Sequence, residues 1–101
     1  MSNKTRGLNA EREARHLLEK EGYEVIPAKG SIGVFDLIAF KPDDVILIQI
    51  KRVKGKYYSF QKDIRAMKNY QGAPITWRKE LRIRLDRMKG RTKQWKKIMI
   101  S

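Results

Sequence analysis

The chain has 101 residues, of which 24 are Lys or Arg and 11 are Asp or Glu, so its formal net charge is +13. A chain of this length forms one domain with a modest core, and the absence of cysteine excludes a disulfide framework and a cysteine-based zinc site. Charge so strongly of one sign predicts a polyanionic partner, and nucleic acid is favoured over a membrane because the apolar residues follow core-like patterns. With no signal peptide and no apolar run of membrane length, we expect a cytoplasmic protein, of cellular, viral or mobile-element origin.

The first helix is expected over residues 8–21, where apolar residues recur at helical spacing and Gly22 can supply a left-handed cap. Thr5 and Asn9 are its candidate N-caps. Its expected buried stripe consists of Ala10, Ala14, Leu17, Leu18 and the stem of Glu21.

Two acids flank this stripe, Glu11 on the side of Leu18 and Glu13 on the side of Leu17. Either carboxylate could reach inward along the rim of the core, and helical geometry does not choose between them. The ordinary alternative for both is compensation of the helix dipole.

A short strand is expected over residues 23–26, before Pro27. The loop that follows, residues 29–33, contains two glycines and a hydroxyl. Such a loop would allow close approach of a phosphate backbone, with Lys29 as the counter-charge.

A β-hairpin is predicted over residues 34–51, because two runs of β-branched and aromatic residues flank a turn with one Pro and two Asp. If Phe40 and Val45 close this turn, Ile38 pairs with Leu47 further along. Side chains alternate along a strand, so one face is wholly apolar. The residues expected on that face are Phe35, Leu37, Ala39, Ile46, Ile48 and Ile50.

Three polar residues share the other face of this hairpin. In the predicted register Asp36 lies opposite Gln49, and Lys51 follows on the same side. A carboxylate and an amide oxygen are suitable ligands for a small hard cation, with the ammonium beside them. The alternative is a solvated outer face, and a register slip of one residue would separate the three.

Residues 52–58 are basic with interleaved aromatics, which is typical of contacts to nucleic acid. A second helix is expected over residues 60–70 with Ser59 as its N-cap, and its basic side chains lie away from its apolar stripe. The candidate nucleic-acid-binding residues are Arg6, Lys29, Arg52, Lys54, Lys56, Lys62 and Arg65.

The last part of the chain alternates apolar and basic residues and predicts strands at residues 75–77, 81–85 and 95–100. They would form a basic C-terminal β-hairpin over about residues 75–101. Between Arg78 and Lys97 the chain has ten basic residues against two acids, which predicts several phosphate contacts.

Asp36, a gap of twelve residues, and then Gln49-Ile50-Lys51 resemble the core motif of the PD-(D/E)xK nuclease superfamily. The segment RGLNAERE from Arg6, with LLEKEGY from Leu17, resembles the start of archaeal Holliday-junction resolvases of the Hjc type, and residues 29–31 and 36–39 match as well. The likeness spans roughly residues 6–72. It implies an α/β fold with a restriction-endonuclease-like αβββαβ core, in which helices flank a mixed central sheet.

The resemblance also implies an Mg²⁺- or Mn²⁺-dependent endonuclease that hydrolyses DNA phosphodiester bonds, with branched DNA as the substrate. It selects Glu11 as the metal ligand of the first helix. It assigns Asp36 as the central metal ligand and Lys51 as the catalytic lysine. Ser31 lies where the resolvases carry a serine near the scissile phosphate, with a gap to Asp36 about one residue longer.

Gln49 departs from the resolvase pattern, because most members carry Glu at this metal ligand; Gln-x-Lys resembles the Mrr-type restriction nucleases. A neutral ligand leaves the site one negative charge short, so we expect weaker metal binding, which Gln49→Glu should strengthen. We expect a structure-selective resolvase that acts as a homodimer on the two symmetric strands of a junction. The alternatives are a restriction or nicking nuclease of phage type and a DNA-binding module that has lost the chemistry.

Overall fold

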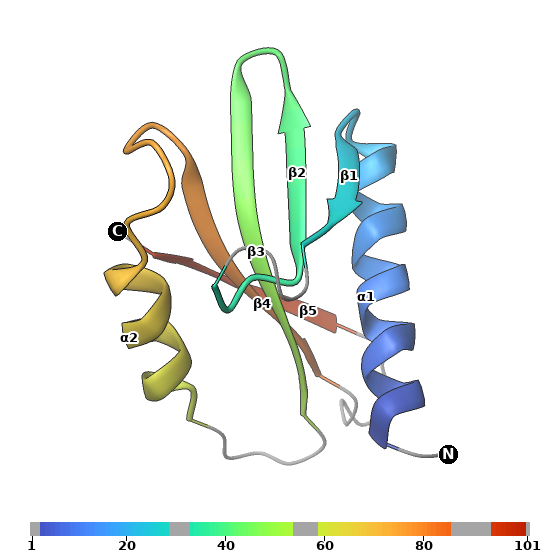
Figure 1. Ribbon diagram of the computed structural model, residues 1–101. Helices are drawn as coiled ribbons and strands as arrows, with labels where there is room; N and C mark the ends of the chain where they lie inside the picture. The colour runs from blue at the N-terminus through green and yellow to red at the C-terminus, as the bar shows by residue number, and fades with distance from the viewer. Residues whose placement is uncertain (1–2, 29–32, 54–58, 86–93, 101) are drawn as a thin grey trace.

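A mixed five-stranded sheet organises the fold of the computed structural model, which describes residues 3–28, 33–53, 59–85 and 94–100. The strands follow the order β1-β2-β3-β4-β5, and only the pair β3–β4 is parallel. This arrangement confirms the expected α/β fold. One helix lies on each side of the central hairpin (Figure 1). Neither of the described helices is long and apolar enough to cross a membrane. The elements are α1 (Asn3–Lys20), β1 (Glu24–Pro27), β2 (Leu37–Lys41), β3 (Asp44–Val53), α2 (Gln61–Asn69), β4 (Arg78–Leu85) and β5 (Gln94–Ile100).

The β2–β3 hairpin forms in the predicted register. Phe40 pairs with Val45 and Ile38 pairs with Leu47. Only Pro42 and Asp43 remain as turn residues, and the fixed φ of proline suits a tight turn. The register therefore followed from two features visible in the sequence, the alternation of the strands and the turn between them.

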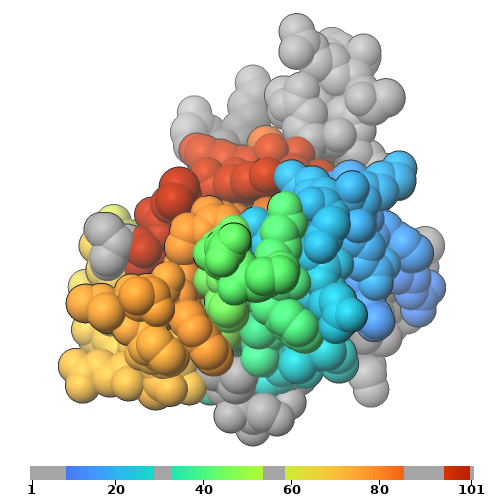
Figure 2. Space-filling model, turned by 90° about the horizontal axis from the view of Figure 1, so that it is seen from above, coloured from blue at the N-terminus to red at the C-terminus, as the bar shows by residue number. Residues whose placement is uncertain are grey.

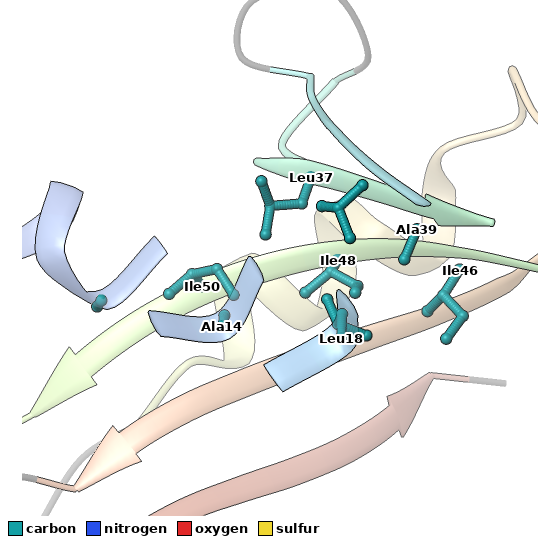
Figure 3. Close-up of a cluster of buried hydrophobic side chains, with 9 residues drawn as sticks. Ala14, Leu18, Leu37, Ala39, Ile46, Ile48 and Ile50 are labelled. Carbon is teal, nitrogen blue, oxygen red and sulfur yellow. The ribbon is translucent and has the colours of Figure 1, made fainter. Parts of the chain in front are cut away.

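α1 packs on one face of this hairpin. Ala14 and Leu18 of α1 lie over β3 in Figure 3, and both are fully buried. The small alanines let the helix backbone come close to the sheet, so branched side chains of the strands fill the space between them. The strand residues of this cluster are Val25, Leu37, Ala39, Ile46, Ile48 and Ile50.

The ends of α1 and the width of its buried stripe differ from the prediction. The helix begins at Asn3, so Thr5 and Asn9 lie inside it and neither is its N-cap. Leu17 is 39% exposed, because it lies 100° around the helix from Leu18, and only the line Ala10, Ala14, Leu18 meets the sheet. Glu21, also expected in the stripe, is exposed because the helix ends at Lys20. Gly22 has a φ of +94°, as a left-handed cap after the helix requires.

The opposite face of the sheet carries a second core under α2. Phe35, predicted on the same face as Leu37 and Ile48, belongs to this second core instead. The reason is that β2 begins only at Leu37, so strand alternation does not reach Phe35. Its ring makes an edge-to-face contact with Tyr70, with 5.5 Å between centroids. The other fully buried members of this core are Leu47, Met67, Leu81 and Ile83.

Two predictions between α2 and β4 are wrong. Phe60 occupies the N-cap position of α2 without a side-chain hydrogen bond, so Ser59 is not the cap. The predicted strand at residues 75–77 is a turn, in which Trp77 N donates to Pro74 O and Ile75 is fully exposed. The chain turns here because it must enter β4 parallel to β3.

An ion pair ties the hairpin turn to the start of β4. Arg78 donates to both carboxylate oxygens of Asp44, at 2.9 and 2.6 Å, and the Tyr23 hydroxyl donates to the same carboxylate. In Figure 2 the segment before β4 (orange) lies beside the hairpin turn (green). The bonds from Arg78 and Tyr23 lower the pKa of Asp44 from 3.8 to about 2, while that of Tyr23 is raised.

Asp44→Asn should therefore destabilise the protein at neutral pH by about 1–2 kcal/mol, a value reduced for the partial exposure of Arg78. A lowered pKa stabilises the fold above the ordinary pKa, and this contribution is lost as the pH falls from about 4 to about 2. Urea unfolding at pH 7 and pH 2 should show the difference between wild type and variant shrinking at low pH. The exposed neighbour Asp43, changed to Asn, is the matched control and should change little. An equal difference at both pH values would contradict this account.

Candidate active site

Asp36 lies where the ladder between β2 and β3 ends. Strand pairing stops at Leu37 and Ile48. Beyond it, Asp36 N donates to Ile48 O, and Ile50 N donates to Asp36 Oδ2, both at 2.8 Å. Ile48 and Ile50 are the two neighbours of Gln49, so Asp36 lies beside this part of β3, and its predicted pairing with Gln49 falls just beyond the end of the ladder. The bond from Ile50 N also fixes the orientation of the Asp36 carboxylate.

Gln49 and Lys51 both reach the same carboxylate on α2. Gln49 Nε2 donates to Asp63 Oδ1 at 3.2 Å, and Lys51 Nζ lies 3.5 Å from that oxygen. Gln49 is only 6% exposed, whereas the Lys51 side chain is 35% exposed. The candidate site therefore contains a buried amide, a partly exposed ammonium and a carboxylate that was not predicted from the sequence.

Asp63 gave no distinct signal in the sequence. An acid in the first turn of a helix is ordinarily explained by the helix dipole. Only the packing of α2 over β3 reveals that this acid meets Gln49 and Lys51. The one hint was Gln49 itself, because a missing carboxylate at that position invites a search for an acid elsewhere.

The structure separates the two acids of α1. Glu13 accepts a hydrogen bond from Trp95 Nε1 at 2.8 Å and lies 3.3 Å from the Arg84 guanidinium, so it serves the packing of α1 against β4 and β5. Glu11 instead lines a hollow of about 170 Å³ together with Leu37, the residue after Asp36. The described lining of this hollow does not include Asp36, Gln49 or Lys51, so the role of Glu11 as a metal ligand stays a prediction.

The basic residues of β4 do not form the phosphate-binding surface expected of them. Arg82 is buried and donates to Glu80 at 3.0 Å, and Arg84 is buried against Glu13. Lys79 Nζ donates to the carbonyls of Met67 and Tyr70 at the end of α2. The reason is that β4 lies inside the sheet, between β3 and β5, so its side chains face the interior on both sides.

Other candidate nucleic-acid contacts lie nearer the site. Lys62 and Arg65 are exposed on α2, on either side of Asp63 in the sequence, and Arg52 is half-buried beside Lys51. Arg6 lies on α1. Four predicted residues fall outside the described residues: Lys29, Ser31, Lys54 and Lys56.

The donor atoms fit a hard divalent cation. Gln49 Oε1 is buried and has no hydrogen-bond partner among the described residues, although a buried acceptor is costly to leave unpaired. Asp36 adds a carboxylate across the hairpin, and oxygen ligands of this kind suit Mg²⁺. Within the described parts of the chain, no three Asp, Glu, His or Cys side chains gather closely enough to hold a metal. A cation here would thus depend on the amide oxygen.

Comparison with known proteins identifies the family and the fold. The family described as archaeal Holliday junction resolvase (Hjc) matches residues 2–90. The crossover junction endodeoxyribonuclease Hjc of Methanocaldococcus jannaschii is 45% identical over 60 residues, which are 58% of this chain and 44% of that protein, so the match spans less than half of that relative. The solved structure of Archaeoglobus fulgidus Hjc, a Holliday junction resolvase, has the same fold, with a TM-score of 0.72, 18% identity, and coverage of 94% of this chain and 73% of that one.

Proposed function

Because this chain belongs to the archaeal Holliday junction resolvase (Hjc) family, we propose that it is a metal-dependent endonuclease that hydrolyses DNA phosphodiester bonds at four-way junctions. The observation that carries the proposal is the end of the hairpin, where the Asp36 carboxylate accepts a hydrogen bond from Ile50 N beside the buried Gln49, and Lys51 follows Gln49 on β3. A carboxylate, an amide oxygen and an ammonium at such a place match the needs of phosphodiester hydrolysis.

Asp36 and Gln49 would hold Mg²⁺ or Mn²⁺, and Glu11 would approach from α1. When bound, such an ion supplies positive charge at the scissile phosphate and lowers the pKa of a water molecule. Lys51, whose ammonium is partly exposed, would donate hydrogen bonds to the phosphate as negative charge develops on it, or orient the attacking water. Ser31 would lie near the same phosphate.

With Gln49 the site should bind the cation less tightly than with a glutamate, since the amide carries no charge. The Gln-x-Lys motif, resembling that of Mrr-type nucleases, is interpreted as an active variation. The rival function is a DNA-binding module without cleavage, and only an activity measurement separates the two.

We expect DNA to contact the exposed basic side chains near the site rather than the basic side chains of β4. On duplex DNA, the logarithm of the binding constant falls with the logarithm of the salt concentration, and each phosphate contacted by a basic side chain adds about 0.9 to this slope. Lys62→Ala combined with Arg65→Ala should therefore reduce the slope by up to about 2. Binding titrations on a four-way junction between low and moderate salt would measure it. A flat salt response of the wild type would contradict the nucleic-acid partner.

A homodimer would suit this substrate, because a junction presents two symmetric strands to cut. The test of the proposed function is incubation of the wild type with labelled four-way junctions, flaps, duplexes and single strands, with and without Mg²⁺. We expect paired incisions in the junction, only with metal. Equal cutting of duplex and junction would favour a restriction or nicking nuclease instead.

A further inference from the structure

The orientation of the Gln49 amide depends on Asp63. Gln49 Nε2 donates to Asp63 Oδ1 at 3.2 Å. If Oε1 and Nε2 of Gln49 exchanged places, Oε1 would face a carboxylate oxygen of Asp63. Two acceptor oxygens without a proton between them cannot form a hydrogen bond. Asp63 therefore selects one of the two amide orientations, with Nε2 toward α2 and Oε1 on the other side.

The selected orientation leaves one acceptor atom, Gln49 Oε1, available to a ligand. Gln49 Oε1 is buried and lacks a hydrogen-bond partner among the described residues. Gln49 as a whole is 6% exposed, so solvent offers little compensation. An acceptor fixed in this way, across the hairpin from the Asp36 carboxylate, is poised for a cation.

Asp63 also stands close to Lys51, at 3.5 Å between Oδ1 and Nζ. One carboxylate from α2 thus contacts both side chains of the Gln49–Lys51 pair. Its negative charge lies next to the position where a glutamate at residue 49 would have placed one.

We propose that Asp63 is a positioning residue for this site: it orients the Gln49 amide so that Oε1 faces the cation, and it supplies from α2 the negative charge that Gln49 lacks. The inference rests on the proposed function for its purpose, but its geometry does not need cleavage. Asp63 and Gln49 form a matched pair, so the effect of changing one of them is expected to depend on the other.

The pairing changes the outcome expected for Gln49→Glu. The new carboxylate would lie beside that of Asp63, and the two would repel each other. Gln49→Glu alone should therefore gain at most about threefold in Mn²⁺ affinity, whereas Gln49→Glu with Asp63→Asn should bind Mn²⁺ at least about tenfold more tightly than Gln49→Glu, as coupled neighbours do in double-mutant cycles. Mn²⁺ titration by calorimetry without DNA measures this. The proposal is overturned if Gln49→Glu alone binds about tenfold more tightly than wild type and Asp63→Asn adds nothing.

A second readout needs neither metal nor activity. In ¹⁵N-edited NMR of the metal-free protein, the Gln49 side-chain amide is identified as the signal missing from Gln49→Glu. Its hydrogen exchange should be slow in wild type and in Asp43→Asn, the matched control, and at least about tenfold faster in Asp63→Ala. Unchanged exchange in a folded Asp63→Ala would overturn the orienting role. If no protein in the series cuts DNA, the proposed function fails, while these two measurements still decide the role of Asp63.

Discussion

Asp36→Asn is expected to reduce metal-dependent junction cleavage by about 10³-fold or more, because a charged ligand is lost where the transition state gains negative charge. The asparagine side chain keeps an oxygen that can accept the hydrogen bond from Ile50 N. The end of the hairpin should therefore stay intact, and junction affinity without metal should change by less than about threefold. Single-turnover cleavage and a binding titration in EDTA measure the two effects separately.

Asp43→Asn is the matched control for this change, since the same substitution is made at an exposed turn residue. It should cleave like the wild type. If Asp36→Asn retained cleavage within about tenfold of wild type, Asp36 would not be the central ligand.

Lys51→Ala should lower the cleavage rate by about 10²–10³-fold, the usual loss when a donor to a developing charge is removed. The metal concentration for half-maximal cleavage should change much less, because the ammonium does not bind the ion. Titration of the rate with Mg²⁺ separates the maximal rate from the metal requirement.

Lys41→Ala is the comparison for Lys51→Ala, because Lys41 lies at the far end of the hairpin, over the Tyr23 ring. It removes a positive charge of the same kind and should cleave normally. Equal losses in both variants would mean that Lys51 contributes only to general attraction of DNA.

Local patterns in the sequence predicted the fold well where neighbouring residues decide it. The hairpin register, with Phe40 opposite Val45, follows from alternation and turn chemistry. Alternation does not extend to Asp36, which precedes β2, and its position next to Gln49 is fixed instead by hydrogen bonds to the neighbours Ile48 and Ile50.

Tertiary context decided the rest. Arg82 and Arg84 alternate with apolar residues like the outer face of an edge strand, yet β4 lies inside the sheet and buries them against Glu80 and Glu13. Asp63 shows the same limit, since its role depends on contacts from α2 to Gln49 and Lys51 of β3. Sequence periodicity describes one element at a time and cannot specify such contacts.

The central claim is that a site with glutamine at residue 49 cleaves DNA. The most direct measurement is single-turnover cleavage of an end-labelled four-way junction by wild type and Asp36→Asn, each with Mg²⁺, Mn²⁺ or EDTA. We predict paired incisions by the wild type that require the metal and that Asp36→Asn does not make. If both proteins bind the junction and leave it uncut under every condition, the protein is a DNA-binding module and the account of the active site is wrong.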